Sequence, residues 1–239
     1  MPRVSSLRRP PIGFAHRGAR AHATENTLEA FTLGVRLGAS GIESDVWLTA
    51  DGVPVLDHDG VIGRLRRTPI GRLDRSSLPP HIPSLAELYA TIGPDLPVSL
   101  DVKDERAFEA TVAVAEEAGA VSNLWLCHPS WQVVAGWRGR SEQVHLVDST
   151  RIGRIEEGPE RRAMSLREAG IEVINMHHSD WTAGLTTLFH RFGIECFGWD
   201  AQQPRILDGL LDMGIDALYS DHVDRMVDAM RRAGSAELP

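Results

Sequence analysis

The chain has 239 residues and carries 25 Lys and Arg against 33 Asp and Glu, a net charge of −8. A composition of 42% hydrophobic and 24% charged residues is typical of a globular protein with one sizeable core and excludes a disordered chain. An acidic surface repels phosphate backbones, so we expect no nucleic-acid partner. Cys127 and Cys196 both lie in apolar runs, which predicts buried free thiols and excludes a disulfide-stapled scaffold.

The first residues include arginines but no apolar stretch after them, which predicts neither a signal peptide nor a membrane anchor. No window approaches the roughly 18 uninterrupted apolar residues that a membrane-spanning helix needs. We therefore expect a cytoplasmic protein without a stable membrane anchor.

Short apolar runs alternate with segments of helical spacing along the whole chain. Strands are expected at 12–16, 41–48, 98–102, 124–127, 144–147, 173–176, 194–199 and 217–219, with a short hairpin return at 53–56. Helices are expected at 27–37, 85–92, 107–118, 131–137, 161–169, 185–192, 204–213 and 223–232.

This alternation implies a parallel sheet with right-handed crossovers. Eight such units in a chain of this length predict an α/β fold, a (β/α)8 TIM barrel, formed by a single domain over residues 1–239. A doubly wound open sheet is the alternative, but it usually has fewer strands, and the chain lacks a glycine-rich dinucleotide turn. Residues 59–83 are rich in arginine and proline and show little periodicity, so we expect an irregular excursion after the second strand, with the arginines of 64–75 in a solvated loop.

In a TIM barrel the chemistry lies where the strands end. Glu43 and Asp45 are two residues apart on one strand, so their side chains face the same side, and Asp101 and Lys103 have the same spacing. Three carboxylates in a low-dielectric cleft repel one another unless a cation joins them, and oxygen ligands favour Mg²⁺ or Ca²⁺ over zinc. The alternative is that Glu43 or Asp45 simply pairs with Lys103 or an arginine.

Two histidines and an arginine also lie near strand ends. His16 and His58 have ordinary pKa values near neutrality, so one can act as a base while the other acts as an acid. The guanidinium of Arg17 can bind a phosphate with two parallel hydrogen bonds. With a metal ion and a lysine, this set can split a phosphate ester without a protein nucleophile. The remaining candidates at strand ends are His128, His177, His178 and Asp221. Side chains in such positions are more often structural, and Asp221 is expected to cap the last helix.

Several motifs carry a family resemblance. In chain order they are His16-Arg17-Gly18, Glu25-Asn26-Thr27, Gly41-Ile42-Glu43-Ser44-Asp45-Val46, Leu48-Thr49-Ala50-Asp51-Gly52, His58-Asp59, Ile82-Pro83-Ser84-Leu85 before Glu87-Leu88, Asp101-Val102-Lys103, Trp199, Gly214-Ile215-Asp216-Ala217 and Ser220-Asp221. This series resembles the glycerophosphodiester phosphodiesterase family, most specifically over the first 60 residues. The resemblance implies a TIM barrel that hydrolyses small-molecule glycerophosphodiesters to glycerol 3-phosphate and an alcohol. It also implies one divalent cation, Mg²⁺ or Ca²⁺, with Mn²⁺ as an option.

The resemblance also implies roles for ten residues. The metal ligands would be Glu43, Asp45 and Asp101, and the acid and base would be His16 and His58. Arg17 and Lys103 would bind the phosphate, and Trp199 would form the wall on the glycerol or alcohol side. Glu25 and Asn26 would support the site. The chain departs from the family at Asp101, where the family usually has Glu. Asp is one methylene shorter, so the ion would lie closer to the strand or take a water ligand.

Two other functions use the same residues. A lipid-active relative, similar to lysophospholipase D or sphingomyelinase D, would use the same His16 and His58 but would need an apolar surface near the barrel mouth. A non-enzymatic phosphate- or metal-binding barrel would be expected to lack a histidine or a carboxylate, and all of them are present.

Overall fold

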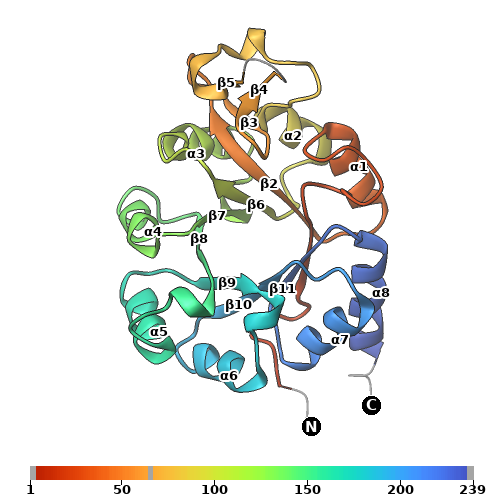
Figure 1. The fold of residues 1–239 in the computed structure, drawn as a ribbon, viewed down its shortest axis with the longest axis vertical. Coiled ribbons are helices and arrows are strands. Elements are labelled where there is room, and N and C mark those ends of the chain that lie inside the picture. The colour runs from red at the N-terminus through yellow and green to blue at the C-terminus, as the bar shows by residue number, and fades with distance from the viewer. Residues whose placement is uncertain (1–3, 64–66, 236–239) are drawn as a thin grey trace.

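A computed structural model of the chain describes residues 4–63 and 67–235, and within them the sheet closes into a barrel (Figure 1). The parallel strands are β1 (Ile12–Ala15), β2 (Gly41–Leu48), β6 (Val98–Val102), β7 (Leu124–His128), β8 (His145–Thr150), β9 (Val173–His177), β10 (Glu195–Trp199) and β11 (Ala217–Ser220). The strands from β6 to β11 pair in chain order, and β1 pairs with both β11 and β2, which closes the ring. The predicted TIM barrel is confirmed.

The helices lie around the outside of this ring (Figure 1). They are α1 (Leu28–Arg36), α2 (Leu85–Ile92), α3 (Ala107–Glu117), α4 (Trp131–Arg138), α5 (Pro159–Glu168), α6 (Ala183–Arg191), α7 (Pro204–Asp212) and α8 (Val223–Ser235). Local signals explain several helix starts, because hydroxyl side chains accept hydrogen bonds from the first free N–H groups. Ser84 and Glu87 form a full capping box at α2, and Thr27 caps α1. Within the described chain, no helix is both long and apolar enough to cross a membrane.

The excursion after β2 has more structure than the sequence indicated. Strand β3 (Pro54–Leu56) returns antiparallel along the end of β2, and β4 (Val61–Ile62) pairs with β5 (Thr68–Pro69). Four apolar side chains form a small separate core beneath this segment: Val55, Ile70, Leu78 and Ile82. The expected irregular loop is therefore a packed hairpin. Arg67 and Arg72 are exposed as expected, but Arg75 is half-buried and pairs with Glu87. Arg64 and Arg66 lie outside the described residues.

The centre of the barrel is filled by aromatic side chains. Phe14 of β1 stacks on Tyr219 of β11 at 4.9 Å between ring centroids, and Phe197 and Trp125 pack beside them. This packing closes the interior below the strand ends, because side chains fill a barrel of eight strands. Cys127 and Cys196 are buried and free, as predicted.

At the opposite end of the barrel, Asp216 ties the N-terminal segment to the strands. Its Oδ1 accepts hydrogen bonds from Ser6 Oγ at 2.6 Å and from the N–H groups of Leu7 and Arg8 at 2.6 and 3.0 Å. Its Oδ2 accepts from the Cys196 N–H at 2.7 Å and contacts His190 Nε2 at 2.8 Å. Burial alone would raise the pKa of Asp216, but these hydrogen bonds lower it below the ordinary value.

We expect Asp216→Asn to lower the free energy of unfolding by about 3 kcal/mol, because it removes a buried charged acceptor from several donors. Since the folded-state pKa lies below the unfolded value of about 4, this stabilisation is present above that pH and is lost as the pH falls through the folded pKa. Urea unfolding of both proteins at neutral and acidic pH checks both statements. Asp208→Asn, which alters a surface ion pair with Arg232, is the matched control and should change little. Equal stability of Asp216→Asn and the wild type at neutral pH would contradict the role of Asp216.

Candidate active site

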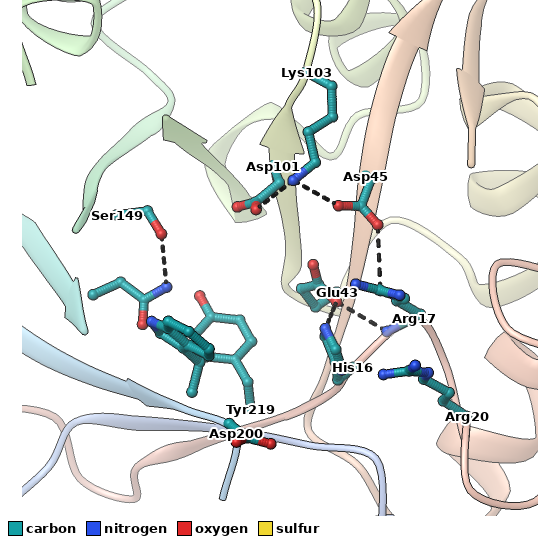
Figure 2. Close-up of a pocket in the computed structure, with 12 residues that line it drawn as sticks. His16, Arg17, Arg20, Glu43, Asp45, Asp101, Lys103, Ser149, Asp200 and Tyr219 are labelled. Carbon is teal, nitrogen blue, oxygen red and sulfur yellow. Dashed lines mark hydrogen bonds and ion pairs between the residues drawn. The ribbon is translucent and has the colours of Figure 1, made fainter. Parts of the chain in front are cut away.

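A cavity of about 340 Å³ opens at the carboxyl ends of the strands (Figure 2). Its lining residues are His16, Arg17, Arg20, Glu43, Asp45, Asp101, Lys103, Ser149, Asn175, Trp199, Asp200 and Tyr219. Seven of the ten residues that the sequence singled out are therefore brought together here, and His58, Glu25 and Asn26 are not in the lining.

Three carboxylates converge on one wall of this cavity. Glu43 and Asp45 point the same way from β2, with only 5% and 2% of each residue exposed, and Asp45 pairs in register with Asp101 of β6. One ligand oxygen from each of the three lies within 4.8 Å of the others. Burial raises the pKa of Glu43 to about 7, and the neighbouring Asp45 and Asp101 add to this rise, against the lowering effect of His16.

Two cations hold this cluster together. Lys103 Nζ lies 3.0 Å from Asp45 Oδ1 and 3.0 Å from Asp101 Oδ2, and the backbone N–H of Arg17 donates to Glu43 Oε2 at 2.9 Å. The ion pairs expected as an alternative to a metal site thus do form. Even so, Asp45 Oδ2 is buried without a hydrogen-bond partner among the described residues; Arg17 Nε lies 3.5 Å away. A buried all-oxygen donor set with an unpaired carboxylate oxygen fits a hard divalent cation.

His16 lies between two acidic side chains. Its Nδ1 is 2.5 Å from Asp221 Oδ1, and its Nε2 is 3.7 Å from Glu43 Oε2. Burial would lower the pKa of His16, but the charges of Glu43 and Asp221 and the hydrogen bond to Asp221 raise it above its ordinary value. The expectation that Asp221 caps α8 is wrong: its carboxylate contacts His16 and, at 3.4 Å, Arg20 Nη1. The chain gives no local signal for this contact, because the two residues are 205 positions apart.

His58 lies beside the site without lining the cavity. Its side chain is 40% exposed, and its Nδ1 is 2.9 Å from Asp59 Oδ1. The preceding residue, Asp57, donates its N–H to the Asp45 carbonyl at 3.1 Å, so the backbone at His58 adjoins the carboxylate cluster.

A tight loop after β1 sets the position of Arg17. Three non-glycine residues in the described chain have positive φ, namely Arg17 (51°), Asn26 (55°) and Asp200 (61°), and all three lie at or beside the cavity. Asn26 donates its N–H to the Arg17 carbonyl at 3.0 Å, and its Oδ1 accepts from Ser44 Oγ at 2.7 Å. Glu25 Oε2 lies 3.2 Å from Arg17 Nη1. These contacts connect Glu25 and Asn26 to the loop that carries Arg17, and their supporting role stays a prediction.

Gly18 allows this loop to lie close to α1. A Cβ atom at Gly18 would lie 2.6 Å from the Ala30 carbonyl carbon, and its φ is +79°. The His-Arg-Gly motif therefore needs glycine for both space and conformation.

The wall that faces the carboxylates was missed by sequence reasoning. Figure 2 shows Ser149 and Tyr219 there, near Asp200. Asn175 and Trp199 complete the lining on this side. Asn175 Nδ2 donates to Ser149 Oγ at 3.2 Å, and its buried Oδ1 has no partner among the described residues. Neutral polar residues inside apolar strands give only a weak signal, namely their inward position near the strand ends. His128, His177 and His178 do not line the cavity.

The segments that build this cavity are similar in sequence to known proteins. A model of the glycerophosphoryl diester phosphodiesterase family matches residues 16–79, which contain the loop after β1, the β2 carboxylates and His58. The resemblance to the glycerophosphodiester phosphodiesterase family is confirmed. The probable glycerophosphodiester phosphodiesterase 2 of Mycobacterium tuberculosis is 27% identical over 93% of this chain and 92% of its own. Glycerophosphodiester phosphodiesterase 1 of Bos taurus is 50% identical, over 21% of this chain and 15% of its own.

Solved structures of the family share the fold. The Thermotoga maritima glycerophosphodiester phosphodiesterase aligns with a TM-score of 0.79 at 23% identity, covering 91% of this chain and 97% of that one. A phosphodiesterase of Oleispira antarctica, solved in complex with the product sn-glycerol-3-phosphate, aligns with a TM-score of 0.81 at 20% identity, covering 92% and 97%. At 23% and 20% identity, these alignments show that the barrel fold is shared.

We expect Asn26→Ala to destabilise the protein by about 2 kcal/mol, because it leaves the buried Ser44 hydroxyl unpaired and places alanine at positive φ. Asn26→Gly keeps the backbone conformation accessible and should lose mainly the hydrogen bond. Thermal unfolding of both variants separates the two contributions. A more stable Asn26→Ala than Asn26→Gly would show that the left-handed conformation at this position is not required.

Proposed function

We propose that this chain hydrolyses glycerophosphodiesters to glycerol 3-phosphate and an alcohol. The observation that carries the proposal is the convergence of Glu43, Asp45 and Asp101 with His16 and two cationic side chains in one cavity. The names of the relatives that match along most of the chain, and the product held by the Oleispira antarctica enzyme, support the same substrate class.

We further propose one divalent cation, Mg²⁺ or Ca²⁺ with Mn²⁺ as an option, held by Glu43, Asp45 and Asp101. The unpaired Asp45 Oδ2 and the mutual repulsion of the three carboxylates support this assignment. When bound, such a cation supplies positive charge beside the phosphate. Asp101, shorter than the glutamate usual in the family, still reaches the cluster because it is in register with Asp45.

The remaining residues bind the phosphate and move protons. Arg17 and Lys103 neutralise the non-bridging phosphoryl oxygens, where charge accumulates as the ester bond breaks. His16, held through Nδ1 by Asp221, exchanges a proton through Nε2. His58 is the second proton-transfer group and must turn away from Asp59 to act. In direct hydrolysis a water forms the new P–O bond and gives its proton to one histidine, and the departing alcohol takes a proton from the other as the old bond breaks. If a hydroxyl of the substrate's own glycerol attacks instead, the alcohol leaves in the same way and a cyclic phosphate forms, which a water then opens to glycerol 3-phosphate.

The polar wall opposite the phosphate site fits a polyol. The free Oδ1 of Asn175 accepts a hydrogen bond, and the Ser149 hydroxyl is beside it. Trp199 offers a flat apolar face next to them. This combination matches the hydroxyls and carbon skeleton of glycerol.

The cytoplasmic location stays a prediction.

The lipid-active alternative lacks the apolar surface that it needs. In the described part of the chain the large exposed hydrophobic residues are Leu7, Val35 and Met164, and none of them lines the cavity. A water-soluble diester therefore fits the mouth better than a lysolipid.

The first test is dependence on metal and substrate. Chelation should abolish hydrolysis of glycerophosphocholine and glycerophosphoethanolamine, and Mg²⁺, Ca²⁺ or Mn²⁺ should restore it. Glu43→Gln and Asp45→Asn should each lower kcat at least about 100-fold because each replaces a charged carboxylate ligand by a neutral amide. Steady-state kinetics check this, with Asp208→Asn as the control and a lysolipid as the alternative substrate. Full activity after removal of metal would contradict the cation, and turnover of the lysolipid alone would contradict the substrate.

The second test concerns the histidine pair. His16→Ala and His58→Ala should each reduce kcat by at least about 100-fold, because each removes a proton-transfer group. A p-nitrophenyl ester has a leaving group that needs little protonation, so it should restore activity to the variant that lacks the general acid. Comparison of kcat for both esters identifies that histidine. A loss of only a few-fold in His58→Ala would remove His58 from the reaction and leave His16 in place.

A further inference from the structure

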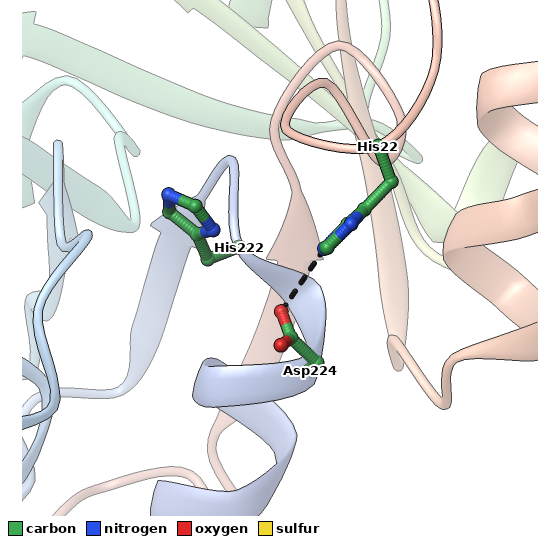
Figure 3. Close-up of side chains that lie close together, drawn as sticks. All are labelled: His22, His222 and Asp224. Atoms are coloured by element: carbon green, nitrogen blue, oxygen red, sulfur yellow. Dashed lines mark hydrogen bonds and ion pairs between the residues drawn. The ribbon is translucent and has the colours of Figure 1, made fainter.

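Two histidines and an aspartate meet outside the cavity, near the same end of the barrel (Figure 3). His22 comes from the loop after β1, His222 from the turn between β11 and α8, and Asp224 from the first turn of α8. One ligand atom of each lies within 4.8 Å of the others, and His22 Nε2 is 3.1 Å from Asp224 Oδ1. That last separation is close to the spacing of two ligand atoms around one tetrahedral metal ion.

The imidazole of His222 is free to bind a ligand. Among the described residues neither of its ring nitrogens has a hydrogen-bond partner, and its ring meets that of His22 edge to face, with 6.1 Å between centroids. The side chains of His22 and Asp224 are 36% and 49% exposed, so an ion from solvent reaches them without any rearrangement of the core.

Two other clusters of the described chain combine histidine with a carboxylate, but some of their ligand atoms are already engaged. In the cluster of His177, His178 and Asp200, Ser179 already engages His177 Nδ1, and the His177 ring packs against the rings of His178 and Trp199 with 4.2 and 4.7 Å between centroids. In the cluster around Asp216, both carboxylate oxygens accept hydrogen bonds from the N-terminal segment and from neighbouring elements.

We propose that His22, His222 and Asp224 form a second metal site, which binds a borderline transition-metal ion such as Zn²⁺ through two imidazoles and one carboxylate. This donor set differs from the all-oxygen set in the cavity, so the two sites select different metals. The inference does not depend on the proposed phosphodiesterase activity. A bound ion links the loop after β1 to the start of α8, the two segments already joined by the hydrogen bond from the Ala21 N–H to the Asp221 carbonyl.

The experiment is a Zn²⁺ titration of the full chain in buffer that contains excess Mg²⁺, followed by calorimetry and by NMR of the histidine rings. The ring signals of His22 and His222 should shift together at one equivalent. His22→Ala, His222→Ala and the conservative Asp224→Asn should each weaken this binding event by at least about tenfold, because each alanine removes an imidazole ligand and Asp224→Asn replaces the charged carboxylate by a neutral amide. His81→Ala, which removes an exposed histidine elsewhere, is the matched control and should bind Zn²⁺ like the wild type.

Melting curves recorded with and without Zn²⁺ show whether each variant is folded and whether it keeps the wild-type increase in Tm. Identical Zn²⁺ isotherms for the wild type, His22→Ala and His222→Ala would overturn the proposal. Shifts confined to the rings of His177 and His178 would overturn it as well, because they would place the ion at the other histidine cluster.

Discussion

Three carboxylates crowded at one edge of the barrel are the constraint around which the site is arranged. Glu43 and Asp45 are almost fully buried on one strand, and Asp101 faces them from the next. Such charges are stable in a low-dielectric environment only where positive charge reaches them. Lys103 supplies it from the position directly after β6, the strand of Asp101, and the loop after β1 brings Arg17 over the cluster. The same positive groups are then available to a phosphate.

The parts of the molecule set by local pattern were predictable. Strand and helix alternation indicated the barrel, and the two-residue spacing of Glu43 and Asp45 placed both side chains on one face. The hairpin of β4 and β5 was not predictable, because its two-residue strands are too short to show a period. The His16–Asp221 contact was missed because it forms only when β1 pairs with β11 and the ring closes.

His58 and Asn175 show two further reasons for the difference between sequence and structure. His58 belongs to a motif of the family, but a motif fixes the backbone position and not the rotamer, and the side chain pairs with its neighbour Asp59. Asn175 lies in an apolar strand, where a lone amide is most simply interpreted as a satisfied core group. Its buried unpaired oxygen is visible only once the facing strands are in place.

Strand β11 connects the stability of the barrel to its chemistry. Asp216 precedes the strand and holds the N-terminal segment, while Asp221 follows it and holds His16. Between them, Ala217 to Ser220 pair residue by residue with Ile12 to Ala15 of β1. A slip of one residue in this register would turn each β11 side chain to the other face and separate Asp221 from His16. The hydrogen bonds at Asp216 oppose such a slip from one end of the strand, and the packing of Tyr219 on Phe14 opposes it from within the barrel. The position of the imidazole thus depends on contacts that extend along the whole strand, so a variant far below the cavity can alter the site without touching it.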